Sequence, residues 1–497
     1  MTYEFGRRSE VKELRLQMDA KATISRRQGR SQTCPLMNMK ATPQSDLNRR
    51  DFLKGGSAAT LMVLMGGVPI NAAEEKKAEG SAEETHYKGE APPLNVGVIG
   101  CGLWAREILK TLALLPNAHV VALCDTYAPF LKRAGDLAPK AERYADCAKV
   151  LENKDVQGVI VATPSHQHKE IVLAALKAGK HVYCEAPIAT TLEDAREIAL
   201  AAKATLKLNF QAGLQNRSDK QLANLCNFVR TGVLGKPLKA RCQFHKKMSW
   251  RLTSPNPDRE KAINWRLNKA ISLGLVGELG IHQADVVNWY LLARPVAVTG
   301  FGSLTQWKDG RDVPDSAMAV FEYPNGVLFN YETTIGNSFD ADLNMFYGTD
   351  CAIMLRDRRA WMFKEVDAPL LGWEVYAKKD AFYKESGIAL GAGQSKQEAQ
   401  AKKATDAVDE KSALQYALEA FLINSHNHTA AVEDFNAAYD PNDVAGLKEY
   451  LAGQEKNRLA AAGFKEGYES AVTVIKANEA VVKGQKITFQ KEWFELG

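Results

Sequence analysis

The spacing of apolar residues changes twice across residues 94–125, and these changes predict a strand, a helix and a second strand. Residues 96–99 are a short, mostly β-branched run bounded by a glycine turn, which is typical of a buried parallel strand. A helical stretch follows, and apolar residues return at 120–123, just before the carboxylate of Asp125. We therefore expect a βαβ unit that begins at Leu94.

Strand and helix patterns continue to alternate after this unit. The expected strands are 156–162, 181–184 and 206–210, and the helices between them are 169–178 and 192–203. Such alternation predicts a doubly wound parallel sheet with right-handed crossovers. Ligands of this architecture bind at the carboxyl ends of the strands.

Strand patterns dominate the next part of the chain. Strands are expected at 238–244, 296–302, 316–323, 326–334 and 343–347, with a hairpin turn at Pro324-Asn325-Gly326 and a last helix at 468–482. The stretch 365–463 is less regular. We interpret it as a helical insertion near the mouth of the active site or at an oligomer edge.

The first 93 residues lack a globular pattern. Residues before about 45 are basic and unpatterned, and Met37 or Met39 is an alternative start. Arg49-Arg50 then precedes Phe52-Leu53-Lys54, a weakly apolar run at 55–68 and small residues at 71–73, which together form a twin-arginine export pattern. We expect the twin-arginine machinery to export the protein to the periplasm; a basic amphipathic tail is the alternative interpretation.

These patterns divide the chain into six parts. They are a disordered extension (1–45), a signal segment (46–73), a linker (74–93), a Rossmann domain (94–213), an α/β domain (214–364 and 464–497) and the helical insertion (365–463).

Twin-arginine export carries folded proteins, and this has a consequence for any nucleotide cofactor. The protein would load its nucleotide before export and could not draw on a free pool afterwards. We therefore expect the cofactor to be tightly held and recycled in place.

Composition excludes several classes of function. The formal net charge of +5 is small for 497 residues, and no basic stretch interleaved with aromatic residues indicates nucleic-acid binding. The eight cysteines are scattered, without C-x-x-C pairs or zinc-ligand spacing. His166 and His168 have no cysteine or carboxylate partners nearby, so we expect no metal site.

The turn Gly100-Cys101-Gly102-Leu103 opens a G-x-G-x-x-A motif that ends at Ala105. The first glycine permits a tight turn, the second lets a pyrophosphate approach the backbone, and the small third residue lets the helix pack on the strand. The helix N-terminus attracts the phosphates. Asp125 is expected to bind the ribose hydroxyls, which favours NAD over NADP because a carboxylate repels a 2′-phosphate.

Longer segments carry a family resemblance. The glycine motif, Asp125, ATPSHQH (162–168), ALKAGKHVYCEAP (175–187) and ELGIHQADVVNW (278–289) together resemble the Gfo/Idh/MocA superfamily of NAD(P)-dependent oxidoreductases. The resemblance implies an N-terminal Rossmann doubly wound parallel sheet followed by an α+β domain with a largely antiparallel open sheet. It also implies cofactor contacts by Thr163, Pro164, His168, Glu185 and Pro187.

One position departs from the family pattern. The family's EKP lysine, which positions a sugar hydroxyl and helps to move its proton, falls on Ala186. Three explanations are open. Another residue supplies the cation, proton transfer depends wholly on the helix expected at 278–289, or the protein has lost ordinary dehydrogenase chemistry. Lys246, Lys247 and Arg251 are candidate cations, although a solvated basic face is the better explanation for each of them.

The segment 278–289 carries the expected proton-transfer chemistry. On one continuous helix, Glu278, His282 and Asp285 would share a face. A carboxylate one turn from an imidazole raises its basicity and fixes its tautomer. We therefore expect His282 as the base and Glu278 as its orienting partner, with Asp285 binding substrate. Arg217 is expected to bind substrate or a phosphate, and a surface salt bridge is an equally good interpretation of it. A satisfied core histidine is the alternative.

Three functions remain open from the sequence. The first is an exported NAD-dependent oxidoreductase acting on a sugar, cyclitol or sugar-derived alcohol with tightly bound cofactor. The second is an NAD-dependent glycoside hydrolase that works through transient sugar oxidation, and the third is a binding protein that retains NAD. The expected partners are a carbohydrate substrate, the export machinery and further copies of the chain as a homo-oligomer.

Overall fold

The structure is a computed structural model that describes residues 92–356, 359–371, 379–382, 385–390 and 411–497. The N-terminal extension, the twin-arginine segment and the linker up to residue 91 lie outside the described residues. Within the described part of the chain, no helix is both long and apolar enough to cross a bilayer.

The first sheet has six parallel strands in the order β3-β2-β1-β4-β5-β6. Its strands are β1 (Leu94–Ile99), β2 (Ala118–Cys124), β3 (Glu142–Tyr144), β4 (Gly158–Val161), β5 (His181–Cys184) and β6 (Phe210–Ala212). The connecting helices are α3 (Leu103–Leu112), α4 (Ala128–Leu137), α5 (Cys147–Glu152), α6 (His168–Lys177) and α7 (Leu192–Ala204). This confirms the predicted doubly wound sheet, and the strand order reverses between β1 and β4, where such sheets bind ligands.

The second sheet has ten strands in the order β14-β15-β13-β12-β11-β7-β10-β9-β8-β16. They are β7 (Pro237–His245), β8 (Ala297–Ser303), β9 (Ser316–Glu322), β10 (Leu328–Thr334), β11 (Asp342–Gly348), β12 (Cys351–Arg356), β13 (Arg359–Lys364), β14 (Lys379–Phe382), β15 (Glu385–Leu390) and β16 (Ile487–Thr488). All neighbours are antiparallel except β7 and β10. The expectation of a largely antiparallel second sheet is therefore confirmed.

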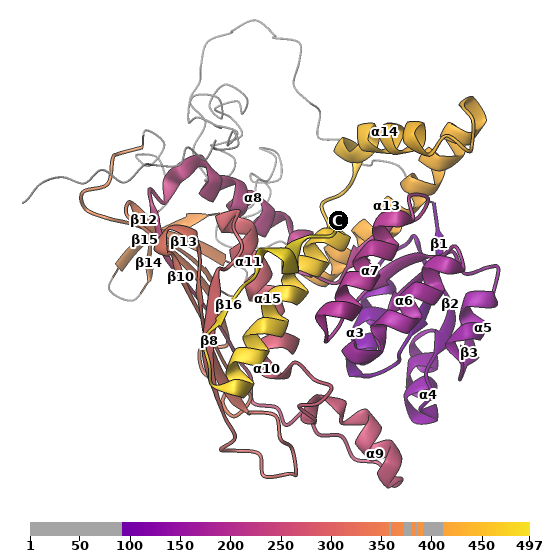
Figure 1. The fold of residues 1–497 in the computed structure, drawn as a ribbon, viewed down its shortest axis with the longest axis horizontal. Helices are drawn as coiled ribbons and strands as arrows, with labels where there is room; N and C mark the ends of the chain where they lie inside the picture. The colour runs from indigo at the N-terminus through magenta and orange to yellow at the C-terminus, as the bar shows by residue number, and fades with distance from the viewer. Residues whose placement is uncertain (1–91, 357–358, 372–378, 383–384, 391–410) are drawn as a thin grey trace, which may run out of the picture. The chain divides into compact units, whose positions relative to one another are not determined.

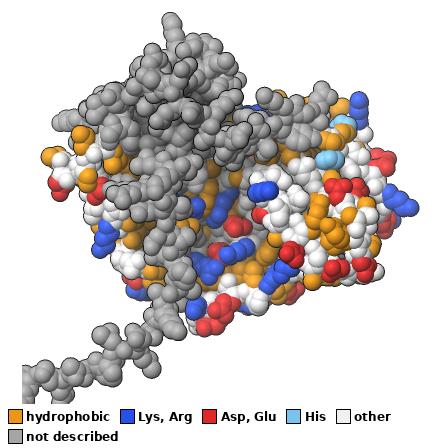
Figure 2. Space-filling model, turned by 90° about the horizontal axis from the view of Figure 1, so that it is seen from above, with side chains coloured by type: hydrophobic (Ala, Val, Ile, Leu, Met, Phe, Trp, Pro, Cys, Tyr) orange, Lys and Arg blue, Asp and Glu red, His pale blue; other side chains and the backbone are white. Residues whose placement is uncertain are grey.

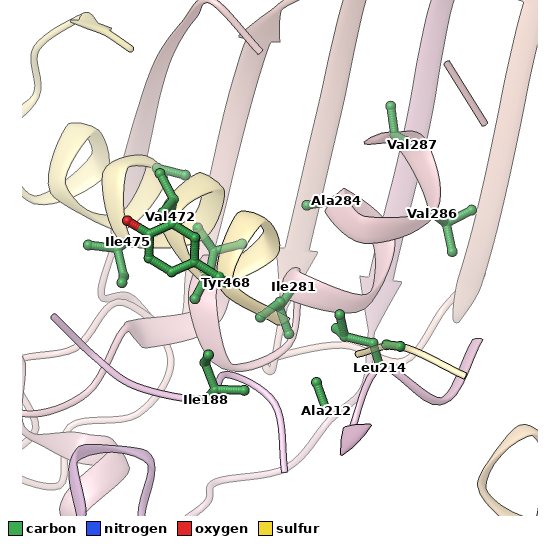
Figure 3. Packing of buried hydrophobic residues seen from close by; sticks show 14 of the residues in the cluster. Ile188, Ala212, Leu214, Ile281, Ala284, Val286, Val287, Tyr468, Val472 and Ile475 are labelled. Carbon is green, nitrogen blue, oxygen red and sulfur yellow. The ribbon is translucent and has the colours of Figure 1, made fainter. Parts of the chain in front are cut away.

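Helices α11 (Ile281–Leu291) and α15 (Phe464–Lys483) pack between the two sheets in one buried apolar cluster. Figure 3 shows Ala212 at the end of β6, and Leu214 just after it, close to Ile281 of α11, while Tyr468 projects from α15. Helix α15 contacts both α7 and β8. The core therefore continues from the Rossmann sheet into the second domain.

The stretch 365–463 differs from the expected helical insertion. Two strands in it, β14 and β15, extend the second sheet, and α13 (Ala413–Ala438) packs with α3 against the parallel sheet (Figure 1). The Phe421 ring lies edge-on to Tyr183 of β5 at 5.7 Å, and Gln211 donates a hydrogen bond to the Ala417 carbonyl. The apolar stripe of α13 at helical spacing is buried because it covers this sheet face.

Three further helices join the second domain and its edges. They are α8 (Lys220–Phe228), α9 (Pro257–Ile263) and α10 (Gly274–Glu278), while α14 (Val444–Gln454) packs on α13. On the face shown in Figure 2, Lys and Arg side chains lie among Asp and Glu side chains rather than in a patch of one charge.

Candidate active site

The glycine turn between β1 and α3 has the geometry of an anion cradle. Gly100 has a φ of +90°, and a Cβ there would lie 2.7 Å from the backbone of Ala162 and Thr163. A Cβ on Gly102 would meet no atom within 4 Å, and this N-cap residue gives α3 no side-chain cap. The N–H groups of the first turn are therefore accessible to a phosphate.

Asp125 lies beside this turn, after β2. Its carboxylate accepts hydrogen bonds from the N–H groups of Cys101 and Tyr127, both at 2.7 Å. Burial raises its pKa, and these two N–H donors oppose that shift. Asp125 thus holds the glycine turn in shape, and each carboxylate oxygen keeps a second lone pair for a ribose hydroxyl. Leu103, the first residue of α3, is 54% exposed.

The loop after β4 has a different organisation from the one expected. Pro164 precedes the 3₁₀ turn η1 (Ser165–Gln167). The ring nitrogens of His168 lie 3.0 Å from the Pro187 carbonyl and 2.9 Å from the Thr163 carbonyl, and burial lowers its pKa to about 4. His168 is 1% exposed and both of its ring nitrogens are engaged, so the ring links the β4 and β5 loops, while its contact with the cofactor stays a prediction.

Glu185 lies at the carboxyl end of β5 and is 8% exposed. Burial raises its pKa to about 7, while the Trp104 indole, the Ala186 N–H and the Arg266 guanidinium stabilise the carboxylate. A Cβ on Gly213 would lie 2.7 Å from its Oε2, so this crossing segment passes close to the carboxylate. Glu185 is thus a buried acid poised to change charge near neutral pH.

Glu278 and His282 do not share one helix. Helix α10 ends at Glu278 and α11 begins at Ile281. The Glu278 carboxylate accepts hydrogen bonds from the Ser165 hydroxyl at 3.0 Å and from the Leu273 N–H at 3.2 Å. The predicted pairing of Glu278 with the imidazole is therefore wrong, because the chain breaks at 279–280 and the carboxylate binds the β4 loop.

His282 lies half-buried in the first turn of α11. Its Nδ1 is buried without a hydrogen-bond partner among the described residues. Burial lowers the pKa of the imidazole, and the charge of Asp285 opposes that shift. The ring is therefore neutral at neutral pH and can accept a proton.

Arg217 and Asp285 bind each other rather than an open site. The guanidinium makes hydrogen bonds of 2.8 to 3.2 Å to both oxygens of Asp285, which is fully buried and also accepts from the Ser470 hydroxyl at 2.8 Å. The Arg217 guanidinium also lies over the Trp289 ring at 5.2 Å. This ion pair ties the segment after β6 to α11, and the substrate roles of both residues stay predictions.

The structure adds Arg266, which the sequence did not indicate. It belongs to the 3₁₀ turn η4 (Trp265–Leu267), and its guanidinium lies 4.4 Å from the centre of the Trp265 ring. Burial raises the pKa of both Glu185 and Glu278, and the positive charge of Arg266 opposes part of each shift. Of the three candidate cations predicted to replace the family lysine, Arg251 is engaged with Glu260 and the Asp309 carbonyl, and Lys246 and Lys247 are exposed.

Several buried polar atoms on these loops lack hydrogen-bond partners within the described part of the chain. They are Thr163 Oγ1, His166 Nδ1, Glu185 Oε1, Gln215 Oε1 and His282 Nδ1. Buried polar atoms normally have partners, so their gathering after β4, β5 and β6 and on α11 fits a polar ligand. With the open Gly102 cradle, the set fits a dinucleotide and a small polar substrate.

A separate groove of about 960 Å³ lies between the ends of α7, α13, α14 and α15. Asn209, His428 and Arg458 are among its lining residues. None of the predicted site residues lines it, so it does not belong to the crevice described above.

Comparison with known families agrees with this geometry. Residues 94–213 match the oxidoreductase family with an NAD-binding Rossmann fold, GFO/IDH/MocA, and residues 223–353 match the GFO/IDH/MocA C-terminal domain.

Inositol 2-dehydrogenases are among the proteins that the chain resembles in sequence. The one from Klebsiella pneumoniae is 31% identical over 254 residues, which cover 50% of this chain and 70% of that protein. The one from Salmonella typhimurium is 30% identical over 200 residues, or 40% of this chain. The chain spans about half, 54%, of the length of that relative.

Solved structures share the fold. Levoglucosan dehydrogenase in complex with NADH superposes with a TM-score of 0.59 at 19% identity, covering 80% of this chain and 99% of that one. An oxidoreductase domain protein from Kribbella flavida superposes with a TM-score of 0.60 at 18% identity, covering 80% of this chain and all of that one.

Proposed function

Because the chain belongs to the Gfo/Idh/MocA family of oxidoreductases and contains its NAD-binding Rossmann domain, we propose that it is an exported NAD-dependent oxidoreductase. Its substrate is a sugar, cyclitol or sugar-derived alcohol. The names of the relatives, inositol and levoglucosan dehydrogenases, support this substrate class. The observation that carries the proposal is the gathering of unpartnered polar atoms, His282 Nδ1 among them, around an open phosphate cradle.

The residues of the chain divide the work in this proposal. Gly100, Gly102 and the N-terminus of α3 hold the pyrophosphate, and Asp125 holds the ribose. NAD, when bound, supplies the hydride acceptor. His282 accepts the hydroxyl proton of the substrate. Glu278 positions the β4 loop through Ser165 instead of orienting the imidazole.

Tight retention of the cofactor is part of the proposal. Arg259 of α9 donates hydrogen bonds of 3.0 Å to the Thr126 hydroxyl and carbonyl, and its guanidinium lies 5.6 Å from the centre of the Tyr127 ring. Tyr127 also donates to Ser254 at 3.3 Å. The second domain thus clasps the loop that follows Asp125, which would slow the release of a nucleotide.

A homo-oligomer is also proposed, with the second sheet as its interface. Phe301 of β8 and Met318 of β9 are cross-strand neighbours with 74% and 54% of their surface exposed. Exposed apolar side chains of this size favour a covered surface. Light scattering of the purified protein tests this point, and a monomer at micromolar concentration would contradict it.

Ala186 favours a second candidate, an NAD-dependent glycoside hydrolase that oxidises its sugar transiently. An alanine there cannot supply the cation expected of an ordinary dehydrogenase of the family. In that cycle the hydride taken from the sugar is returned to the oxidised product after cleavage, so NAD is regenerated in place, which suits a protein that cannot exchange its cofactor.

One assay separates the candidates. Protein purified without residues 1–73 is analysed for bound nucleotide by mass spectrometry, then incubated with myo-inositol, levoglucosan or nitrophenyl glycosides. NAD reduction by a free polyol supports the dehydrogenase, and nitrophenol release without added NAD supports the hydrolase. Bound nucleotide with neither activity would leave a binding protein.

A further inference from the structure

Arg266 lies against two indole rings and, unlike Arg217 and Arg311, forms no ion pair with a described residue. Its guanidinium lies 4.4 Å from the centre of the Trp265 ring and 6.0 Å from that of Trp250. Trp265 is 6% exposed and in turn lies 5.8 Å from the His166 ring of the β4 loop. Stacking on indoles engages the faces of a guanidinium and leaves its in-plane N–H donors free.

Those donors have no acceptor within the described part of the chain. Arg217 pairs with Asp285 and Arg311 pairs with Asp309, but Arg266 forms no hydrogen bond and no ion pair with a described residue. A half-buried guanidinium without an acceptor is costly unless a ligand supplies one.

The backbone of Trp250 gives a second sign of a built site. Its φ is +62°, a left-handed conformation that a bulky residue rarely adopts. The surrounding loops hold it in place: Arg311 donates to the Ser249 carbonyl, and Leu252 donates to the Asn264 side chain at 2.8 Å. Non-glycine residues held in this conformation cluster at functional sites.

The charges nearby indicate which ligand fits. Glu185 and Glu278, both 8% exposed, act electrostatically on Arg266. Burial raises the pKa of both acids, so they compensate part of the positive charge of the guanidinium, and an anionic ligand beside them would be repelled once they ionise. A neutral ligand with a pair of oxygen acceptors avoids that repulsion.

We infer that Arg266 binds the substrate, holding two adjacent hydroxyl oxygens of a neutral polyol through its in-plane N–H groups. The inference rests on the proposed function and names a residue for it. Ala186 places no cation on the β5 loop, and Arg266 supplies one from the second domain. A guanidinium does not lose its proton, so Arg266 positions the substrate while proton transfer stays with His282.

Arg266→Met and Arg266→Lys test the inference, with Arg241→Met as the matched control. Arg241 pairs with Glu332 on the second sheet and has no place in the crevice. Steady-state oxidation is measured with myo-inositol, levoglucosan and D-glucuronate, and bound nucleotide is quantified by mass spectrometry. Tryptophan fluorescence during myo-inositol titration gives a binding readout independent of turnover.

We expect Arg266→Met to raise KM for the neutral polyols about tenfold or more, as loss of a charged hydrogen-bonding partner does. Nucleotide content stays unchanged. Arg266→Lys recovers part of the loss, and Arg241→Met behaves like wild type.

Two outcomes overturn the inference while leaving the proposed function intact. One is an unchanged KM and an unchanged fluorescence titration in Arg266→Met, and the other is a preference of the wild type for D-glucuronate over both neutral polyols. Failure of the wild type to oxidise or bind any of the three compounds contradicts the proposed function itself.

Discussion

The imidazole of His282 combines partial burial with a nitrogen that has no partner among the described residues. A neutral ring in this state can accept a proton but is not held by a carboxylate, since Glu278 bonds to Ser165 and Leu273 instead. The orientation of the ring therefore depends on α11 and on what binds beside it.

His282→Ala should lower kcat by about 100-fold or more, the range usual for loss of a general base. Nucleotide content should stay at the wild-type level, because the phosphate cradle lies on another element. Steady-state kinetics and mass spectrometry measure the two effects. His119→Ala, a change at an exposed histidine, is the control. Full activity in His282→Ala would show that His282 is not the base.

Glu185 is a buried acid whose pKa is raised to about 7, against an ordinary value of 4.5. Below pH 4.5 both folded and unfolded chains hold its proton. Between pH 4.5 and about 7 only the folded chain keeps this proton. The free energy of unfolding therefore falls as the pH rises through this range, by on the order of 3 kcal/mol in total from Glu185.

Glu185→Gln should therefore gain stability relative to wild type at pH 8 and show a smaller difference at pH 5. Urea unfolding of nucleotide-free protein at the two pH values measures this, and the comparison of variants cancels other titrating groups. An equal difference at both pH values would contradict the raised pKa.

At the scale of elements, the two glycines of the turn into α3 serve different purposes: Gly100 is needed for the backbone fold, and Gly102 leaves room for a ligand. Gly100 is required by its positive φ and its close neighbours, whereas Gly102 has an ordinary φ of −65° and open space around it. The two glycines thus meet different physical demands within one motif.

Gly102→Ala should leave thermal stability nearly unchanged and weaken NAD binding about tenfold or more, because its methyl group occupies the space needed by the pyrophosphate. Gly100→Ala should destabilise the fold by roughly 1 to 2 kcal/mol or more from the left-handed backbone alone. Calorimetric titration with NAD and thermal melts distinguish the two. Unchanged NAD affinity in Gly102→Ala would contradict the placement of the pyrophosphate beside Gly102.

The α9 clasp connects the second domain to the loop after Asp125. Arg259→Ala removes the bonds to Thr126 and the contact with Tyr127, so NAD should dissociate several-fold faster while turnover chemistry is preserved. Chasing bound NADH fluorescence with excess NAD measures this rate. Lys261→Ala, an exposed change on the same helix, should have no effect; equal rates in both variants would argue against the clasp.

At the scale of the whole molecule, one apolar core extends through both sheets, with α15 touching each domain. Removing α15 would therefore expose apolar core residues of both domains to solvent. A chain built in this way folds as a unit, which suits an export route that carries folded proteins.

Export makes a prediction about the whole chain. Changing Arg49 and Arg50 together to lysine should keep the protein in the cytoplasm with its N-terminus uncleaved, because the twin-arginine machinery reads the arginine pair. Cell fractionation and N-terminal mass measurement check this in a host with that machinery. Normal periplasmic recovery of the Lys-Lys variant would contradict the export proposal.

The local order of the chain was readable from its sequence. The glycine turn, the alternation of strands and helices, and the antiparallel strands follow from spacing over a few residues, where backbone sterics and apolar periodicity act directly. The same local constraints predict a tight turn around Gly100 and Gly102, and the structure has it there, with a positive φ at Gly100 and open space at Gly102. The break between Glu278 and His282 was not, because helical spacing alone cannot show that a helix stops at 278.

Tertiary structure alone decided the partners of the charged side chains. Arg217 binds Asp285 across 68 residues, and Ser165 binds Glu278 across 113. Arg266 gains its place only when Trp250, Glu185 and Glu278 are brought around it. Charge pairing depends on distance and burial in space, and several partners are equally compatible with the sequence until packing selects one.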